Sequence, residues 1–280
     1  RIRRCVLTDL EWILFIAAGL CSALSTLGYL ASLLMKKVHL ARVSSWVLAA
    51  GFVLLSVVLV ASVFHPEGLR GFGSRRILII YAWAIAGIYL GLQFKTKTRV
   101  LGAFLAPVIL LFLIAAAGSG ADRNLIPIAW QGWLTVVHLV LAIAGEALFV
   151  LASAAGAMFL MQNRLIKHKK TAAMIRFLPS LGDLDRLNAI GLLWGFALLT
   201  LGMIGGAVYA AFVWEGAWAS DPKILWSLAA WAVYGILLHQ RLAIGWRGVR
   251  MAALSCAAFV LFVGTALVIR FCLPTIHSFI

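Results

Sequence analysis

Eight apolar runs, each about as long as a membrane-crossing helix, constrain the fold of this chain more than any other feature. A helix needs about 20 apolar residues to cross the roughly 30 Å hydrocarbon core of a bilayer. Because no water satisfies the backbone there, such a run is expected to be helical. The runs are Trp12–Met35, Ser45–Phe64, Leu78–Phe94, Val100–Gly118, Trp133–Met161, Ala189–Val213, Ile224–His239 and Met251–Cys272.

The composition excludes a water-soluble fold. Of the 280 residues, 64% are hydrophobic and 12% are charged, whereas soluble domains average about 45–50% apolar and about 25% charged residues. The sequence therefore predicts an all-α integral membrane protein with about eight transmembrane helices joined by short loops. The chain begins at Arg1 rather than at Met, and we expect its natural start to lie upstream.

The basic residues predict the orientation of the chain. A net charge of +15 can indicate nucleic-acid binding, but in a membrane chain Lys and Arg usually mark cytoplasmic loops. Fifteen of the 24 Lys and Arg residues lie in the first, third, fifth and seventh loops, and nine lie on the other side. The positive-inside rule then predicts that both termini and the loop after the sixth run face outward. Nucleic acid is not an expected partner.

Three histidines and one glutamate are the polar residues that point most to a function. His138 begins the fifth run, His239 ends the seventh and His277 follows the eighth. The expected topology places His138 and His277 at the external face, where two imidazoles can hold one haem iron, although each can equally be an interfacial histidine with no task. Glu146 lies well inside a run. At that depth a glutamate can be a proton relay, a ligand contact or a protonated structural residue.

The loop before the seventh run combines tryptophan with an Asp-Pro-Lys sequence. It reads Trp214-Glu-Gly-Ala-Trp218-Ala-Ser-Asp221-Pro222-Lys223. Tryptophans are common at membrane interfaces. The alternative interpretation of each one is an interfacial residue with no part in ligand binding. Flat indole faces also suit a flat hydrophobic macrocycle, and Lys223 is placed to meet the propionates of a haem.

This loop resembles the tryptophan-rich WWD haem-handling domain of cytochrome c assembly proteins of the CcsA/ResC type. The family pattern is roughly W-G-x-x-W-x-W-D-P-K, and the chain matches it at Trp214, Trp218, Asp221, Pro222 and Lys223. It departs from the pattern at Glu215, Ser220 and Ile224. The resemblance is specific from about Trp133 to Ser278, and before that it is hydropathic apart from Arg99–Phe104.

The resemblance implies a role in which the chain receives haem b through the membrane and presents it outside for thioether attachment to apocytochrome c. His138 and His277 would be the external axial ligands of the haem iron, and His239 would be the intramembrane histidine on the cytoplasmic side. The implied platform for the haem consists of Trp214, Trp218 and Asp221. The implied location is the inner (cytoplasmic) membrane, with the haem site on the periplasmic side and a second membrane subunit as partner.

We expect two regions, an N-terminal four-helix membrane region over residues 1–128 and a haem-handling region with four helices over residues 129–280. The alternative function is a HemX-like membrane regulator or scaffold of haem biosynthesis with a degenerate haem site. A cytochrome b subunit would need paired transmembrane histidines, and a small-solute transporter would need broken helices around a midplane site. We identify no catalytic residues, because the attachment chemistry belongs to haem vinyl groups and substrate thiols.

Overall fold

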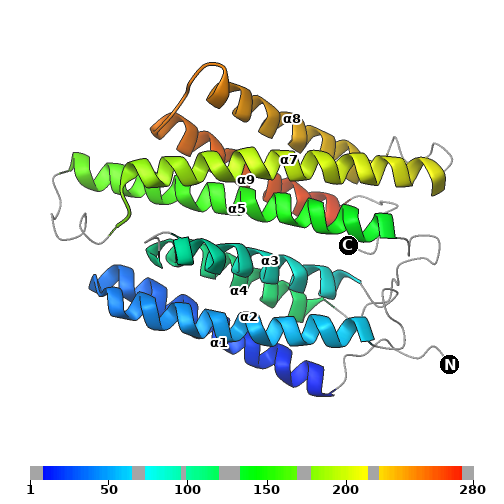
Figure 1. Ribbon diagram of the computed structural model, residues 1–280, viewed down its shortest axis with the longest axis horizontal. Coiled ribbons are helices and arrows are strands. Elements are labelled where there is room, and N and C mark those ends of the chain that lie inside the picture. Colours follow the sequence, from blue (N-terminus) through cyan, green and yellow to red (C-terminus); the bar gives the residue numbers. More distant parts are fainter. Residues whose placement is uncertain are drawn as a thin grey trace. The chain divides into compact units, whose positions relative to one another are not determined.

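Every regular element in the described part of the chain is a helix. The computed structural model describes residues 9–64, 73–95, 99–119, 133–168, 178–213 and 221–272. Its elements, drawn in Figure 1, are α1 (Asp9–Met35), α2 (Val38–Phe64), α3 (Ser74–Lys95), the 3-10 turn η2 (Arg99–Leu101), α4 (Gly102–Gly118), α5 (Trp133–Lys167), α7 (Leu181–Val213), α8 (Pro222–Leu242) and α9 (Val249–Cys272). Each apolar run lies within one of these helices, with η2 beginning the fourth run, so the predicted all-α fold is confirmed.

Six of the described helices are long and apolar enough to cross a membrane: α1, α2, α3, α4 together with η2, α5 and α7. Helix α8, whose last turn contains the polar sequence His239-Gln240-Arg241, is not among them. The described apolar part of α9 is the shorter stretch Val249–Val263. The number of spans and the sides on which the termini lie therefore stay predictions.

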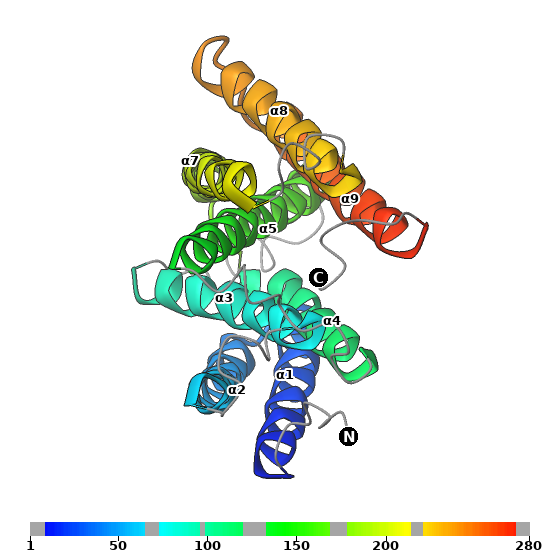
Figure 2. The same cartoon turned by 90° about the vertical axis from the view of Figure 1, so that its right-hand side faces the viewer.

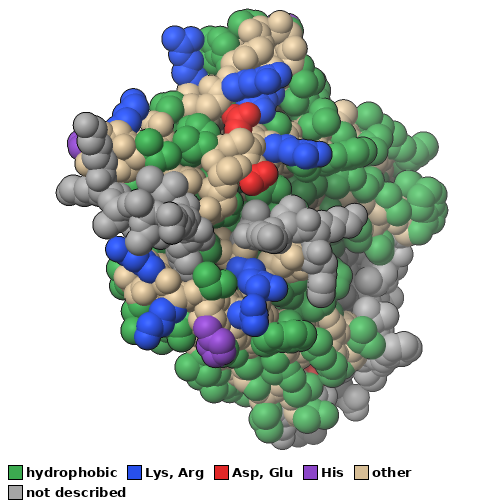
Figure 3. Space-filling view, turned by 60° about the vertical axis from the view of Figure 1, so that its left-hand side comes forward, with side chains coloured by type: hydrophobic (Ala, Val, Ile, Leu, Met, Phe, Trp, Pro, Cys, Tyr) green, Lys and Arg blue, Asp and Glu red, His purple; other side chains and the backbone are tan. Residues whose placement is uncertain are grey.

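Large apolar side chains on the long helices are exposed rather than packed. Leu34 and Phe212 are each 81% exposed, and Trp46 is 71% exposed. Water would penalise so much apolar surface, whereas lipid hydrocarbon accepts it. On the face drawn in Figure 3, hydrophobic side chains cover wide areas. The chain is a multi-pass membrane protein.

Packing contacts divide the described helices into two units. In the first unit, α1 packs on α2 and α4, and α3 packs on the same two helices. In the second unit, α5 packs on α7 and α9, and α8 packs on α7 and α9. Figure 2 shows α5 and α7 lying side by side within the second unit, with α8 and α9 forming a second pair.

A buried polar cluster joins the helices of the first unit. The Tyr29 hydroxyl donates to Oγ of Ser45 over 2.9 Å and accepts from Nε2 of Gln93 over 3.3 Å. The Tyr89 hydroxyl lies 3.1 Å from that of Tyr29 and donates to the Arg99 carbonyl oxygen over 2.7 Å. Both tyrosines are fully buried. The cluster therefore links α1, α2 and α3 to the start of η2. Because its groups are buried, water cannot replace a hydrogen-bond partner that is lost.

Gly102 lies against the ring of Tyr29 and the hydroxyl of Tyr89, and a Cβ at this position would overlap both. We expect Gly102→Ala to lower the free energy of unfolding by about 1–3 kcal/mol, the usual cost of overpacking. Gly91→Ala is the control, because a Cβ there meets nothing within 4 Å. Thermal unfolding of the detergent-purified protein should give a lower Tm for Gly102→Ala than for Gly91→Ala. Equal melting temperatures would contradict the tight packing of the cluster.

Candidate functional site

His138 lies in the second turn of α5 and contacts the backbone of α7. Its Nδ1 atom is 2.7 Å from the Gly202 carbonyl oxygen. A carbonyl oxygen only accepts hydrogen bonds, so Nδ1 must carry the proton. In the neutral imidazole, Nε2 then keeps its lone pair and is the nitrogen free to bind a metal.

Glycines on α7 make the room that this ring occupies. A Cβ at Gly206 would lie 2.7 Å from Nδ1 and 2.8 Å from Cε1 of His138. One turn earlier on α7, a Cβ at Gly202 would lie 3.0 Å from the backbone nitrogen of Ala142. By contrast, a Cβ at Gly205 would come only within 4.0 Å of His138. The imidazole therefore packs directly on the backbone of α7, at a position that has no side chain.

The Asp-Pro-Lys sequence begins α8 and brings Lys223 toward His138. Asp221 is the N-cap, and its Oδ1 accepts from the backbone N–H of Lys223 over 3.0 Å and of Ile224 over 3.4 Å. Pro222 follows at the first helical position, where its missing N–H costs nothing. The Nζ atom of Lys223 is buried, and its charge acts on the His138 imidazole.

Two further buried polar atoms lie one helical turn from these residues. Thr135 precedes His138 by three positions on α5, and Trp226 follows Lys223 by three positions on α8. Neither Oγ1 of Thr135 nor Nε1 of Trp226 has a hydrogen-bond partner among the described residues. A buried polar group without a partner costs about 1–3 kcal/mol, so this end of the second unit holds donors that suit a ligand. The sequence analysis did not identify Thr135.

Glu146 is half-buried on α5, eight positions beyond His138. That separation is about 12 Å along a helix. Its carboxylate acts electrostatically on the hydroxyl of Tyr234 in α8, and the Tyr234 ring stacks on Phe149 with a centroid distance of 3.5 Å. Glu146 therefore belongs to the α5–α8 contact, and its expected part in ligand binding stays a prediction.

His239 lies at the far end of α8, away from His138. Its side chain is exposed in the last turn, and its carbonyl accepts from the N–H of Ala243. The 16 positions from Lys223 to His239 correspond to about 24 Å of helix. Lys223 thus lies within electrostatic range of His138, and His239 lies at the opposite end of α8. Trp214, Trp218 and His277 lie outside the described residues, so their expected roles stay predictions.

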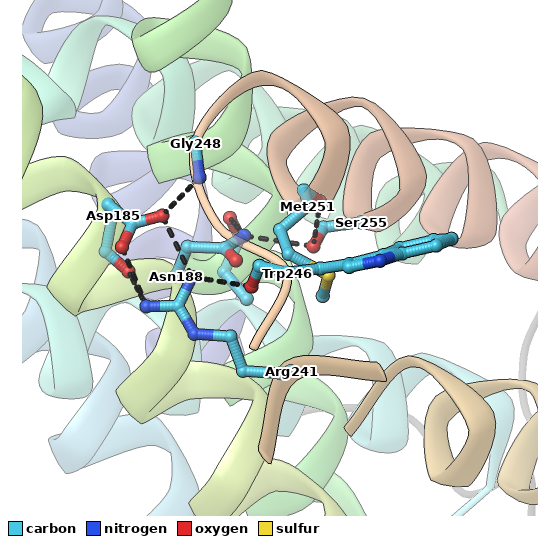
Figure 4. Close-up of polar contacts among 8 residues, drawn as sticks. Asp185, Asn188, Arg241, Trp246, Gly248, Met251 and Ser255 are labelled. Atoms are coloured by element: carbon cyan, nitrogen blue, oxygen red, sulfur yellow. Dashed lines mark hydrogen bonds and ion pairs between the residues drawn. The ribbon is translucent and has the colours of Figure 1, made fainter. Parts of the chain in front are cut away.

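An ion pair at this far end was not found by sequence reasoning. Asp185 in the second turn of α7 accepts two hydrogen bonds from the Arg241 guanidinium, over 2.8 and 2.6 Å, and one from the Gly248 N–H over 2.8 Å (Figure 4). Asn188, one turn further, donates to the Ala152 carbonyl oxygen and to Ser255 Oγ. We call these contacts of Asp185 with Arg241 and Gly248 the Asp185 clasp. It fixes α8 and the start of α9 on α7.

Comparison with known proteins assigns the family. A family model described as "Cytochrome C assembly protein" matches residues 74–277, which is more than half of the chain. The chain belongs to the cytochrome c assembly protein family. The match begins at α3, so it includes part of the first unit as well as every described site residue of the second.

Individual relatives agree with this assignment. The chain is 28% identical over 226 residues to the cytochrome c biogenesis protein CcsA of Prochlorococcus marinus (strain MIT 9312), covering 72% of this chain and 73% of that protein. It is 33% identical over 194 residues to the protein of the same name from Chlamydomonas reinhardtii, covering 65% of this chain and 53% of that protein. The resemblance to the CcsA type is therefore confirmed.

The first prediction from this site concerns the glycine under His138. We expect Gly206→Ala to displace the imidazole from the Gly202 carbonyl and to lower the free energy of unfolding by about 1–3 kcal/mol. Gly205→Ala changes the neighbouring residue in the same way but leaves room for its Cβ. Thermal unfolding in detergent should distinguish the two variants. A Gly205→Ala protein as unstable as Gly206→Ala would reject the contact.

The second prediction concerns the Asp185 clasp. The side chains of Arg241 and Asp185 are 10% and 19% exposed, so Asp185→Asn leaves a mostly buried guanidinium with a poorer partner. We expect a loss of about 2–3 kcal/mol in unfolding free energy, below the roughly 3–5 kcal/mol of a fully buried pair. Asp183→Asn is the matched control, since exposed Asp183 bonds, among the residues that the structure describes, only with Ser180 just before α7. A larger loss in the control would show that the clasp carries little stability.

Proposed function

We propose that this protein binds haem b and presents it at the external face of the membrane, where the haem is attached to apocytochrome c. The hydrogen bond from Nδ1 of His138 to the Gly202 carbonyl is the observation that carries the proposal. Metal-binding histidines usually donate their other ring nitrogen to a carbonyl or carboxylate, which fixes the tautomer and the ring. Because the porphyrin provides four nitrogen ligands, one or two imidazoles suffice to complete the coordination of the iron.

The residues around His138 fit a ligand that is flat, apolar and acidic at its edge. Lys223 brings a positive charge to the surroundings of His138, which favours an acidic ligand. Thr135 and Trp226 offer buried hydrogen-bonding groups. The stacking of Trp226 on Phe262, with centroids 6.2 Å apart, adds aromatic surface. Trp214 and Trp218 extend the proposed platform, and Asp221 supports it by capping the helix that carries Lys223.

The bond-forming chemistry comes from the cargo and its acceptor, since haem vinyl groups and cysteine thiols form the thioethers. The residues of this chain bind and orient. In the proposed role, His138 and His277 hold the iron at the periplasmic side of the inner membrane. Exposed His239, near the cytoplasmic end, meets incoming haem together with a second membrane subunit. The haem then passes to apocytochrome c.

An absorption spectrum of the detergent-purified protein tests the proposal. The wild type should retain haem with a low-spin spectrum, and His138→Ala should retain at least about tenfold less, the scale seen when a metal site loses support. Added imidazole should restore binding to His138→Ala, because it replaces the missing ligand. His168→Ala is the control, since His168 is exposed just beyond α5.

Two results would count against a haem-presenting role. One is a His138→Ala protein that retains as much haem as the wild type, which would move the ligand elsewhere. The other is a wild type that neither purifies with haem nor binds added haem, which favours a HemX-like scaffold with a degenerate site. His277→Ala completes the series, because the proposal requires it to match His138→Ala.

A further inference from the structure

A cavity of about 480 Å³ opens between α7 and α8 beside the Asp185 clasp. It lies at the opposite end of α8 from Lys223, so it is separate from the site around His138, and it lies at the same end of α8 as His239. The cavity is lined by Gly182, Asp185, Arg186, Ala189, Ile190, Leu193, Leu238, Arg241, Leu242 and Arg247. The lining thus combines charged residues with an aliphatic surface.

The charges of the lining do not cancel. Arg241 is held by Asp185 in a bidentate pair, and Figure 4 shows the guanidinium directed at that carboxylate. Arg186 and Arg247 line the same cavity, are exposed, and form no hydrogen bond or ion pair with the described residues, and the charge of Arg247 also acts on Asp185. The cavity therefore has two guanidinium groups available for an anion. Arginine suits phosphate especially well because its planar donors can bind two oxygens at once.

The aliphatic part of the lining continues from the arginines along the helices. On α7, Ile190 and Leu193 follow Arg186 on successive turns, and on α8, Leu238 precedes Arg241 by one turn. Ile190 and Leu193 are 37% and 42% exposed. A molecule that places an anion at the arginines can therefore lay a hydrocarbon chain along the same cavity. Such a molecule is an amphiphile.

We propose that this cavity binds one acidic phospholipid, with its phosphate between Arg186 and Arg247 and an acyl chain along Ile190 and Leu193. Basic pockets between transmembrane helices bind acidic lipid headgroups. The basic loops predict that this end of the second unit faces the cytoplasm, whose leaflet carries anionic lipid. Among the described residues, the lining has no histidine or aromatic side chain to favour haem. The lipid site does not include His138, Lys223 or His239, although it lies at the end of α8 that carries His239.

Native mass spectrometry of the full chain, released from vesicles of equal parts phosphatidylglycerol and phosphatidylcholine, tests the proposal. The wild type should retain one phosphatidylglycerol in preference to phosphatidylcholine. Each basic residue near a membrane surface strengthens acidic-lipid binding about fivefold, so the double variant Arg186→Gln/Arg247→Gln should bind about 20- to 30-fold more weakly. Arg186→Lys/Arg247→Lys keeps both charges and should retain most of the lipid.

The matched control removes two charges from the same end of the unit without touching the cavity. Arg164→Gln/Lys167→Gln does this, because both residues lie in the last turns of α5 and neither lines the cavity. Equal loss of lipid in this control would overturn the proposal, as would equal retention of the two lipids by the wild type.

A second variant keeps the test valid if the glutamine variant does not fold. Leu193→Trp fills the aliphatic wall and leaves both arginines, so phosphatidylglycerol retention should fall. Unchanged retention would reject the acyl-chain position. Haemin that displaces phosphatidylglycerol from the wild type, and fails to bind Arg186→Gln/Arg247→Gln, would assign the cavity to haem instead and overturn the lipid proposal.

Discussion

The close approach of α5 and α7 is the contact on which the second unit depends. Lipid is as apolar as leucine, so membrane helices associate where small residues let their backbones meet. A Cβ at Gly145 would lie 2.8 Å from the Gly195 carbonyl oxygen, and one at Gly191 would lie 2.7 Å from the Leu148 carbonyl oxygen. Any side chain at these glycines forces the helices apart. Both ends of α7, one holding the His138 contact and the other the Asp185 clasp, would then move away from α5.

Helix α8 links these two ends because it is attached at each of them. Its first turn carries Lys223 near His138, and its last turn carries Arg241 in the Asp185 clasp. Between them, Trp231 donates to Oγ1 of Thr200 on α7 over 2.9 Å. Helix α8 is therefore held on α7 near its middle by the Trp231–Thr200 hydrogen bond and at its last turn by the Asp185 clasp.

The helices were predictable from the sequence, whereas the contacts that position the site were not. Run length alone identified each helix. However, α5 continues to Lys167, beyond the predicted end at Met161. Once a helix has formed, each further residue adds one hydrogen bond, so polar residues can continue it beyond the apolar run. The motif identified Lys223, and the position at the external start of the fifth apolar run identified His138. The His138–Gly202 and Asp185–Arg241 contacts join residues 64 and 56 positions apart, and their pairing depends on which helices pack together. The recurring glycines of α7 were the available signal for the first of them.

The way in which His138 is held explains why glycine stands at position 206. A carbonyl within an α-helix accepts from the N–H four residues on, and its oxygen has a second lone pair. For Gly202 that N–H belongs to Gly206, whose Cβ, if present, would stand 2.7 Å from Nδ1 of His138. Glycine therefore gives the imidazole access to the second lone pair. The backbone of a packed helix then sets the direction of Nε2. The orientation of the imidazole therefore does not depend on the rotamer of another side chain. A histidine that repeatedly takes up and releases cargo would keep its geometry for as long as α5 and α7 stay together.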